Sequence, residues 1–178
     1  MRGELRALYP LLQGPGGTPG PLRSLSYDLS RFNPEFWRRP RSFLRDAHRR
    51  GVGVQIELWD PHDFWDWGPS GLWSKNPWNP SMNVSYGAGD TILSERWPHH
   101  PSEKPNPFFL APEKGDEVLL KYQEHFVTRV LEETIEFPNV LYCVDNETWA
   151  PPEWSLYWAR FMHERAREAG VEPQLTEM

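Results

Sequence analysis

Helical and strand patterns alternate along most of this chain, and this alternation is the feature that most limits its possible folds. An amphipathic pattern at residues 33–51 is followed by a strand-like run at 52–60 and then by a long segment without a period. Helical and strand patterns alternate again from residue 116 onward. Strands that are separated by helices pair in parallel through crossover connections. The order therefore predicts an α/β fold with a parallel sheet, either doubly wound or a segment of a (β/α)8 barrel.

The predicted helices carry start and stop signals at their ends. Asn33 suits an N-cap, Pro34 the first helical position and Gly51 the C-terminal stop. A second helix is predicted from residue 116 up to Pro138, and a third follows the proline pair that begins at Pro151. Their predicted core faces carry the apolar residues Phe36, Trp37, Phe43, Leu44 and Ala47, then Val118, Leu119, Tyr122, Phe126, Val130 and Leu131, and finally Trp154, Tyr157, Trp158, Phe161 and Met162.

Three short runs between these helices read as strands. In "VGVQIELWD" aliphatic residues alternate with Gln55, Glu57 and Trp59, so one face is predicted to be aliphatic and the other polar or aromatic. The run "NVLYCVDNE" predicts a buried strand, and "EPQLTEM" predicts the start of another.

Composition narrows the functional classes. The 178 residues, 38% hydrophobic and 25% charged, suit one globular domain. The net charge of -6 argues against a nucleic-acid partner, which needs clustered positive charge. No apolar run approaches the roughly 20 residues of a membrane span, so no membrane association is predicted. The single cysteine, Cys143, excludes an internal disulfide, and no signal for a particular compartment is visible.

Two segments are predicted to be loops. Residues 1–26 are rich in glycine and proline and predict an irregular N-terminal loop. Residues 61–115 show no sustained period, and a loop of that length in a compact domain is usually functional. Its tryptophans could stack against the apolar faces of sugar rings, or they could pack the loop onto the sheet. The aromatic residues that we expect at a ligand site are Trp59, Trp65, Trp67, Trp73 and Trp78.

Polar residues at the predicted strand ends are the candidate site. Asp60, Asn146 and Glu147 each follow an apolar run, and reactive residues of α/β folds gather at the carboxyl ends of strands. A carboxylic acid there could protonate a glycosidic oxygen while a second carboxylate attacks the sugar or activates water. Alternatively, Glu147 could simply cap the helix that follows it. The histidines and aspartates near Asp60 have no recognised metal-ligand spacing, so neither a metal nor a cofactor is predicted.

Three segments taken in order resemble a known family. "YDLSRFNPEFWRR…AHRRGVGVQIELWD", "NPWNPSMN" and "YQEHFVTRVLEETIEFPNVLYCVDNE" are similar to the (β/α)8-barrel glycoside hydrolases of clan A, most nearly the family 5 cellulase-like enzymes. The likeness covers about residues 27–160. It implies that Glu147 is the general acid/base and that Asn146 contacts the sugar 2-hydroxyl. Asp60 would then bind substrate.

The chain also departs from that family. Thr148 stands where many members have proline, and Cys143 stands where many have a glutamate. The family's nucleophile is a glutamate at the end of strand seven, whereas the patterns here reach only about strand five. We therefore expect one partial barrel domain over residues 1–178, holding about half of the βα units. Glu57 is expected to be a buried hydrogen-bonding residue, and Glu177 is a poor substitute for the nucleophile.

The sequence thus predicts a fragment of a glycoside hydrolase that acts on β-linked carbohydrate and is inactive alone. Two alternatives stay open: a non-catalytic carbohydrate-binding domain, or a structural half-barrel. The carbohydrate is the expected partner, and self-association through the open sheet edges is also expected because unpaired strands invite pairing.

Overall fold

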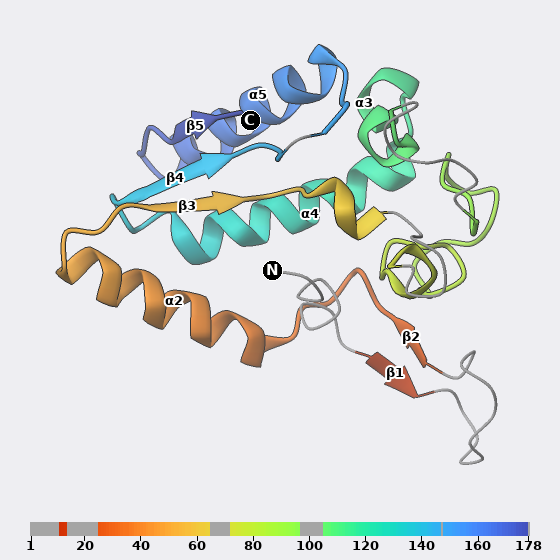
Figure 1. Cartoon of the computed structure of the whole chain (residues 1–178), viewed down its shortest axis with the longest axis horizontal. Coiled ribbons are helices and arrows are strands. Elements are labelled where there is room, and N and C mark those ends of the chain that lie inside the picture. The colour runs from red at the N-terminus through yellow and green to blue at the C-terminus, as the bar shows by residue number, and fades with distance from the viewer. Residues whose placement is uncertain (1–10, 14–24, 65–71, 97–104, 147, 178) are drawn as a thin grey trace.

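A computed structural model describes residues 11–13, 25–64, 72–96, 105–146 and 148–177 of the chain (Figure 1). Its centre is a parallel sheet of β3 (Val54–Glu57), β4 (Val140–Cys143) and β5 (Gln174–Thr176), which lie side by side in chain order. Helix α4 (Glu117–Thr134) leads from β3 to β4, and α5 (Pro152–Glu168) leads from β4 to β5. The predicted α/β fold with a parallel sheet is confirmed, while three strands do not by themselves make a barrel.

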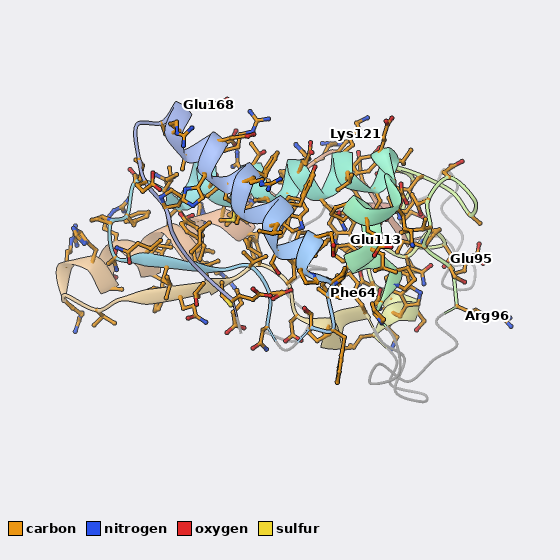
Figure 2. The ribbon with its side chains drawn as sticks, turned by 90° about the horizontal axis from the view of Figure 1, so that it is seen from above. Phe64, Glu95, Arg96, Glu113, Lys121 and Glu168 are labelled. Atoms are coloured by element: carbon orange, nitrogen blue, oxygen red, sulfur yellow. The ribbon has the colours of Figure 1, made fainter. Side chains whose placement is uncertain are left out.

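The two faces of this sheet have different coverings. Helices α4 and α5 lie together on one side of the strands (Figures 1 and 2). Ile56, Tyr142 and Leu175 share a register row and face this side, where the Tyr142 hydroxyl lies 2.9 Å from Thr134 Oγ1 of α4. The adjacent row, which includes Glu57, therefore faces the other way. No helix of the described residues covers that second face.

Helix α2 (Pro34–Arg49) precedes the sheet and follows the predicted signals. The Asn33 side chain caps it by accepting a hydrogen bond from the Glu35 N–H at 3.1 Å, and Gly51 has a φ of 67°, as a left-handed stop requires. Trp37, Leu44 and Ala47 are buried as predicted, but Phe43 is 62% exposed. Its predicted place on the core face is wrong because the buried stripe is narrower than the apolar pattern.

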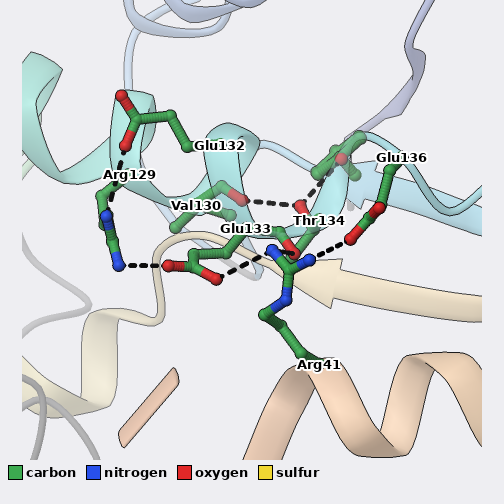
Figure 3. Close-up of polar contacts among 8 residues, drawn as sticks. Arg41, Arg129, Val130, Glu132, Glu133, Thr134 and Glu136 are labelled. Carbon is green, nitrogen blue, oxygen red and sulfur yellow. Dashed lines mark hydrogen bonds and ion pairs between the residues drawn. The ribbon is translucent and has the colours of Figure 1, made fainter. Parts of the chain in front are cut away.

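A chain of ion pairs ties α2 to α4 (Figure 3). Arg41 Nη1 lies 3.1 Å from Glu133 Oε2, and the other guanidinium nitrogen pairs with Glu136. Glu133 also pairs with Arg129 one turn earlier in its own helix. Because the Glu133 side chain is only 10% exposed, the two arginines compensate a carboxylate that is largely removed from water.

Asp116 caps α4: one carboxylate oxygen accepts a hydrogen bond from the Leu119 N–H at 2.9 Å, and the other accepts one from the Ile92 N–H at 2.7 Å.

The core on the helix side is strongly aromatic. Rings from both helices and from the long loop pack into one core cluster, which includes Phe64, whose ring centroid lies 4.1 Å from that of Phe108. Charged side chains such as Arg96, Lys121 and Glu168 lie at the outside of the molecule (Figure 2). None of the helices in the described ranges has both the length and the apolar character needed to cross a bilayer.

The N-terminal segment is more regular than predicted. Strands β1 (Leu11–Gln13) and β2 (Leu25–Tyr27) pair antiparallel, and all of their residues except Tyr27 lie within the expected irregular loop 1–26. Each is a short extended run beside the Gly/Pro-rich stretch that separates them, so the pattern was too brief to detect. Tyr27 then anchors this ribbon to the long loop, because its N–H donates to Met82 O at 2.8 Å and its carbonyl accepts from the Val84 N–H at 2.9 Å.

Buried asparagines organise the long loop between residues 61 and 115. The described parts contain the short helices η2 (Pro61–Phe64), η4 (Trp73–Lys75), η6 (Pro107–Leu110) and α3 (Ala111–Lys114). The Asn79 amide donates to the carbonyls of Trp73 and Glu95 at 3.0 and 2.9 Å, and the Asn83 amide donates to those of Pro77 and Asn79 at 3.1 and 3.0 Å. Side-chain amides thus satisfy backbone groups that a sheet would otherwise satisfy.

Candidate functional site

Two of the predicted site residues lie together at the carboxyl edge of the sheet. Beyond the regular strands, the Asn146 N–H donates to the Trp59 carbonyl at 3.0 Å. This bond joins the extensions of β3 and β4, so that Asp60 and Asn146 occupy neighbouring backbone positions. Both residues are half-buried, which leaves part of each side chain accessible to a ligand. A carboxylate and an amide side by side can together bind the hydroxyl groups of a polar ligand.

A third polar residue, Asp145, lies in the interior at the same edge. It is fully buried, and its Oδ2 accepts a hydrogen bond from the Thr148 hydroxyl at 2.5 Å. Its Oδ1 is buried and has no hydrogen-bond partner among the described residues. The Cys143 thiol donates to the Asp145 backbone carbonyl at 2.9 Å. The hydrogen bond from the Thr148 hydroxyl thus holds Thr148 against Asp145, just beyond the end of β4.

The electrostatic environment favours the neutral form of Asp145. Burial raises the pKa of this carboxyl above its ordinary value, the hydrogen bond from Thr148 lowers it, and the nearby charge of Glu177 raises it. Burial also raises the pKa of the Cys143 thiol, and the charge of Glu57 adds to this effect. Several carboxyl groups therefore lie near one another at the strand ends, and Asp145 holds a proton more readily than an exposed aspartate does.

The two other glutamates considered from the sequence differ in their surroundings. Glu57 lies in β3, is half-buried and is in register with Cys143 on the side of the sheet away from the helices. Glu177 is exposed just after β5, where its carboxylate accepts a hydrogen bond from the Ser155 hydroxyl of α5 at 2.7 Å. Glu177 is therefore attached to the helix that follows the candidate site.

The three expected ligand-site tryptophans that the structure describes are buried. Trp59, Trp73 and Trp78 are each at most 1% exposed, so their rings offer no accessible face to a sugar. The sequence pattern placed Trp59 on the polar face of the strand, but β3 ends at Glu57 and its alternation does not extend to Trp59. The Trp59 ring lies against Phe126 of α4 and Trp158 of α5, with ring centroids 4.8 and 5.8 Å away. The alternative interpretation, that these tryptophans pack the loop and core, accounts for their positions.

Other predicted residues lie outside the described part of the chain. Glu147, Trp65 and Trp67 are among them, and their roles stay predictions. Within the described ranges, no group of three or more His, Cys, Asp or Glu side chains is arranged to hold a metal ion.

Sequence reasoning missed two residues at this edge, Asp145 and Trp149. Asp145 directly follows the apolar run of β4, which is the same signal that identified Asn146. Trp149 stands between a polar strand end and the proline pair that begins α5, so neither a strand nor a helix pattern buries it. It is 62% exposed. This exposure follows from the packing of the folded chain and has no signal in the sequence.

Comparisons of the chain with protein-family models, curated proteins and solved structures give no match.

Proposed function

We propose that the chain belongs to a glycoside hydrolase that cleaves β-linked oligosaccharides or polysaccharides, with Glu147 as the proton donor. One observation carries the proposal: Asp60 and Asn146 lie beside one another at the carboxyl ends of neighbouring parallel strands, and the buried Asp145 directly precedes Asn146. Catalytic residues of parallel α/β folds occupy this edge. The sequence resemblance supplies the reaction class.

The proposed complete fold is a (β/α)8 barrel. Support comes from the strand order, which follows the chain, and from α4 and α5, which lie on one side of the sheet as the outer helices of a barrel do. The opposite side carries Gln55, Glu57 and Thr176, which would face the barrel interior. Further strands would pair with the outer edges of β3 and β5.

Each residue has a distinct role in the proposed reaction. Glu147 donates its proton to the glycosidic oxygen as the bond to the anomeric carbon breaks. A second carboxylate attacks that carbon or activates water, and by the family resemblance it comes from the seventh strand of the barrel. The Asn146 side chain binds the sugar 2-hydroxyl, and Asp60 accepts hydrogen bonds from other hydroxyls.

Replacement of Glu147 by Gln in the full-length protein tests the proposal. General acid/base assistance contributes typically 10²- to 10⁴-fold, so hydrolysis of unactivated β-linked oligosaccharides should fall by about that factor. Hydrolysis of 2,4-dinitrophenyl β-glycosides should suffer much less in its bond-breaking step, because that leaving group needs little protonation. Glu153→Gln is the matched control, since Glu153 is exposed in the first turn of α5 and is expected to leave both rates unchanged.

Two results would contradict the proposal. Equal rates for Glu147→Gln and the unmutated protein on an unactivated substrate would remove Glu147 from the chemistry. Tight binding of oligosaccharides without turnover by the unmutated full-length protein would favour the non-catalytic carbohydrate-binding domain instead.

A further inference from the structure

Trp149 differs sharply from the other tryptophans that the structure describes. It is 62% exposed, whereas those others are at most 5% exposed. Burial of a large aromatic side chain is strongly favoured, so a tryptophan that stays in solvent and lies close in the sequence to a polar strand end points to a binding surface. Trp149 follows Asn146 by three positions, at the same edge of the sheet as Asp60.

The short segment that carries Trp149 is fixed at both ends. On one side, the Thr148 hydroxyl donates a hydrogen bond to Asp145 Oδ2 at 2.5 Å. The same hydroxyl oxygen accepts a hydrogen bond from the Ala150 N–H at 3.4 Å. On the other side, Pro151 is the N-cap of α5 and Pro152 is its first residue. Because proline fixes φ, these two residues restrict the backbone where the segment enters the helix. A ligand would therefore lose little free energy in ordering the backbone on either side of Trp149.

We propose that Trp149 is the aromatic platform on which a sugar ring of the substrate stacks, an inference that rests on the proposed function. A pyranose ring in a β-linked chain has apolar C–H groups on its faces and hydroxyl groups around its rim. An exposed indole matches the faces, and the half-buried Asn146 and Asp60 match the rim. A nucleobase could stack in the same way, but the net charge of -6 disfavours a phosphate backbone.

Calorimetric titration of the full-length protein tests this platform. The Glu147→Gln variant is used as the background so that the probes stay intact, and the probes are cellotetraose, xylotetraose and mannotetraose. Trp149→Ala should weaken the best probe about tenfold, which corresponds to about 1.4 kcal/mol. Trp149→Phe should recover part of that loss because it keeps an aromatic face. Neither change should alter the melting temperature, since the side chain is exposed.

Phe43→Ala is the matched control. Phe43 is also 62% exposed, but it lies on α2, away from the carboxyl edge of the sheet. It should leave the affinity unchanged, which separates a local role of Trp149 from a general effect of removing an exposed aromatic side chain.

The outcomes distinguish this inference from the proposed function. Unchanged affinity in Trp149→Ala, or a loss of affinity that is matched by a fall in melting temperature, overturns the platform. Hydrolysis by the unmutated protein, measured separately, decides the proposed function in either case. If no probe binds and no glycoside is hydrolysed, the proposed function fails and the platform fails with it.

Discussion

Replacement of Trp59 by Ala distinguishes a core tryptophan from a ligand-binding one. Trp59 follows β3 beside the candidate site, yet it is 1% exposed and is surrounded by the rings of Trp78, Phe108, Phe126, Trp154 and Trp158. These ring centroids lie between 4.8 and 6.0 Å from its own. The substitution therefore removes the centre of an aromatic cluster rather than a surface contact.

The expected loss of stability is large. Replacement of a buried Trp or Phe by Ala costs about 3–5 kcal/mol of unfolding free energy, because apolar burial is lost and a cavity is left behind. Neighbouring rings from two helices and the long loop cannot all move to fill that cavity, so the upper half of the range is expected. For a chain of this size, each kcal/mol lowers the melting temperature by about 2–4 °C, so a loss in the upper half of that range gives a fall of about 8–20 °C.

Urea denaturation and thermal unfolding of the protein would measure this loss. The midpoint should fall while the slope against urea stays the same, because the surface exposed on unfolding is nearly unchanged. Trp149→Ala makes the same chemical change in solvent and should shift the unfolding free energy by less than about 0.5 kcal/mol. If Trp59→Ala instead kept full stability and weakened oligosaccharide binding, Trp59 would be a ligand-binding residue and the packing described above would be refuted.

Two further predictions concern charged groups. Asp145→Asn should stabilise the fold at pH 7, because the raised pKa of Asp145 means that its ionisation opposes folding. This gain in stability should vanish as the pH falls below 3.8, the ordinary pKa of an aspartate, where Asp145 is protonated in the folded and unfolded states alike. Urea denaturation at several pH values would measure the effect. Arg41→Ala should lower the free energy of unfolding, measured in urea, by about 1 kcal/mol, because it leaves the buried Glu133 with fewer partners. Loss of the exposed Arg38–Glu35 pair is the comparison and should cost less than about 0.5 kcal/mol.

The sequence predicted the elements better than their exact faces. The pattern located α2 and α4 to within a few residues because caps such as Asn33 and Asp116 act locally and can be recognised without the rest of the fold. Phe43 was misplaced because the width of a buried stripe depends on what packs against the helix. The β1–β2 ribbon was missed because two three-residue strands carry almost no periodic signal.

The candidate site was predictable only in part. Asp60 and Asn146 were found because a polar residue after an apolar run marks a strand end, and the parallel sheet brings such ends together. The exposure of a tryptophan has no comparable signal in the sequence. Buried Trp73 and exposed Trp149 both lie in proline-containing stretches of the sequence without a sustained period, and only the three-dimensional packing separates them.

Asp145 gives a physical reason to regard this edge as functional rather than merely structural. The buried Asp145 carboxyl has one oxygen without a hydrogen-bond partner among the residues that the structure describes, which costs folding free energy, and an apolar residue at the end of β4 would avoid that cost. The aromatic core and the ion pairs of Arg41 make the fold stable elsewhere, so the cost can be tolerated there. Local conflicts of this kind are concentrated at functional sites. The hydrogen bond that Asp145 accepts from Thr148 gives this cost a purpose, because it holds in place the residue that directly precedes Trp149.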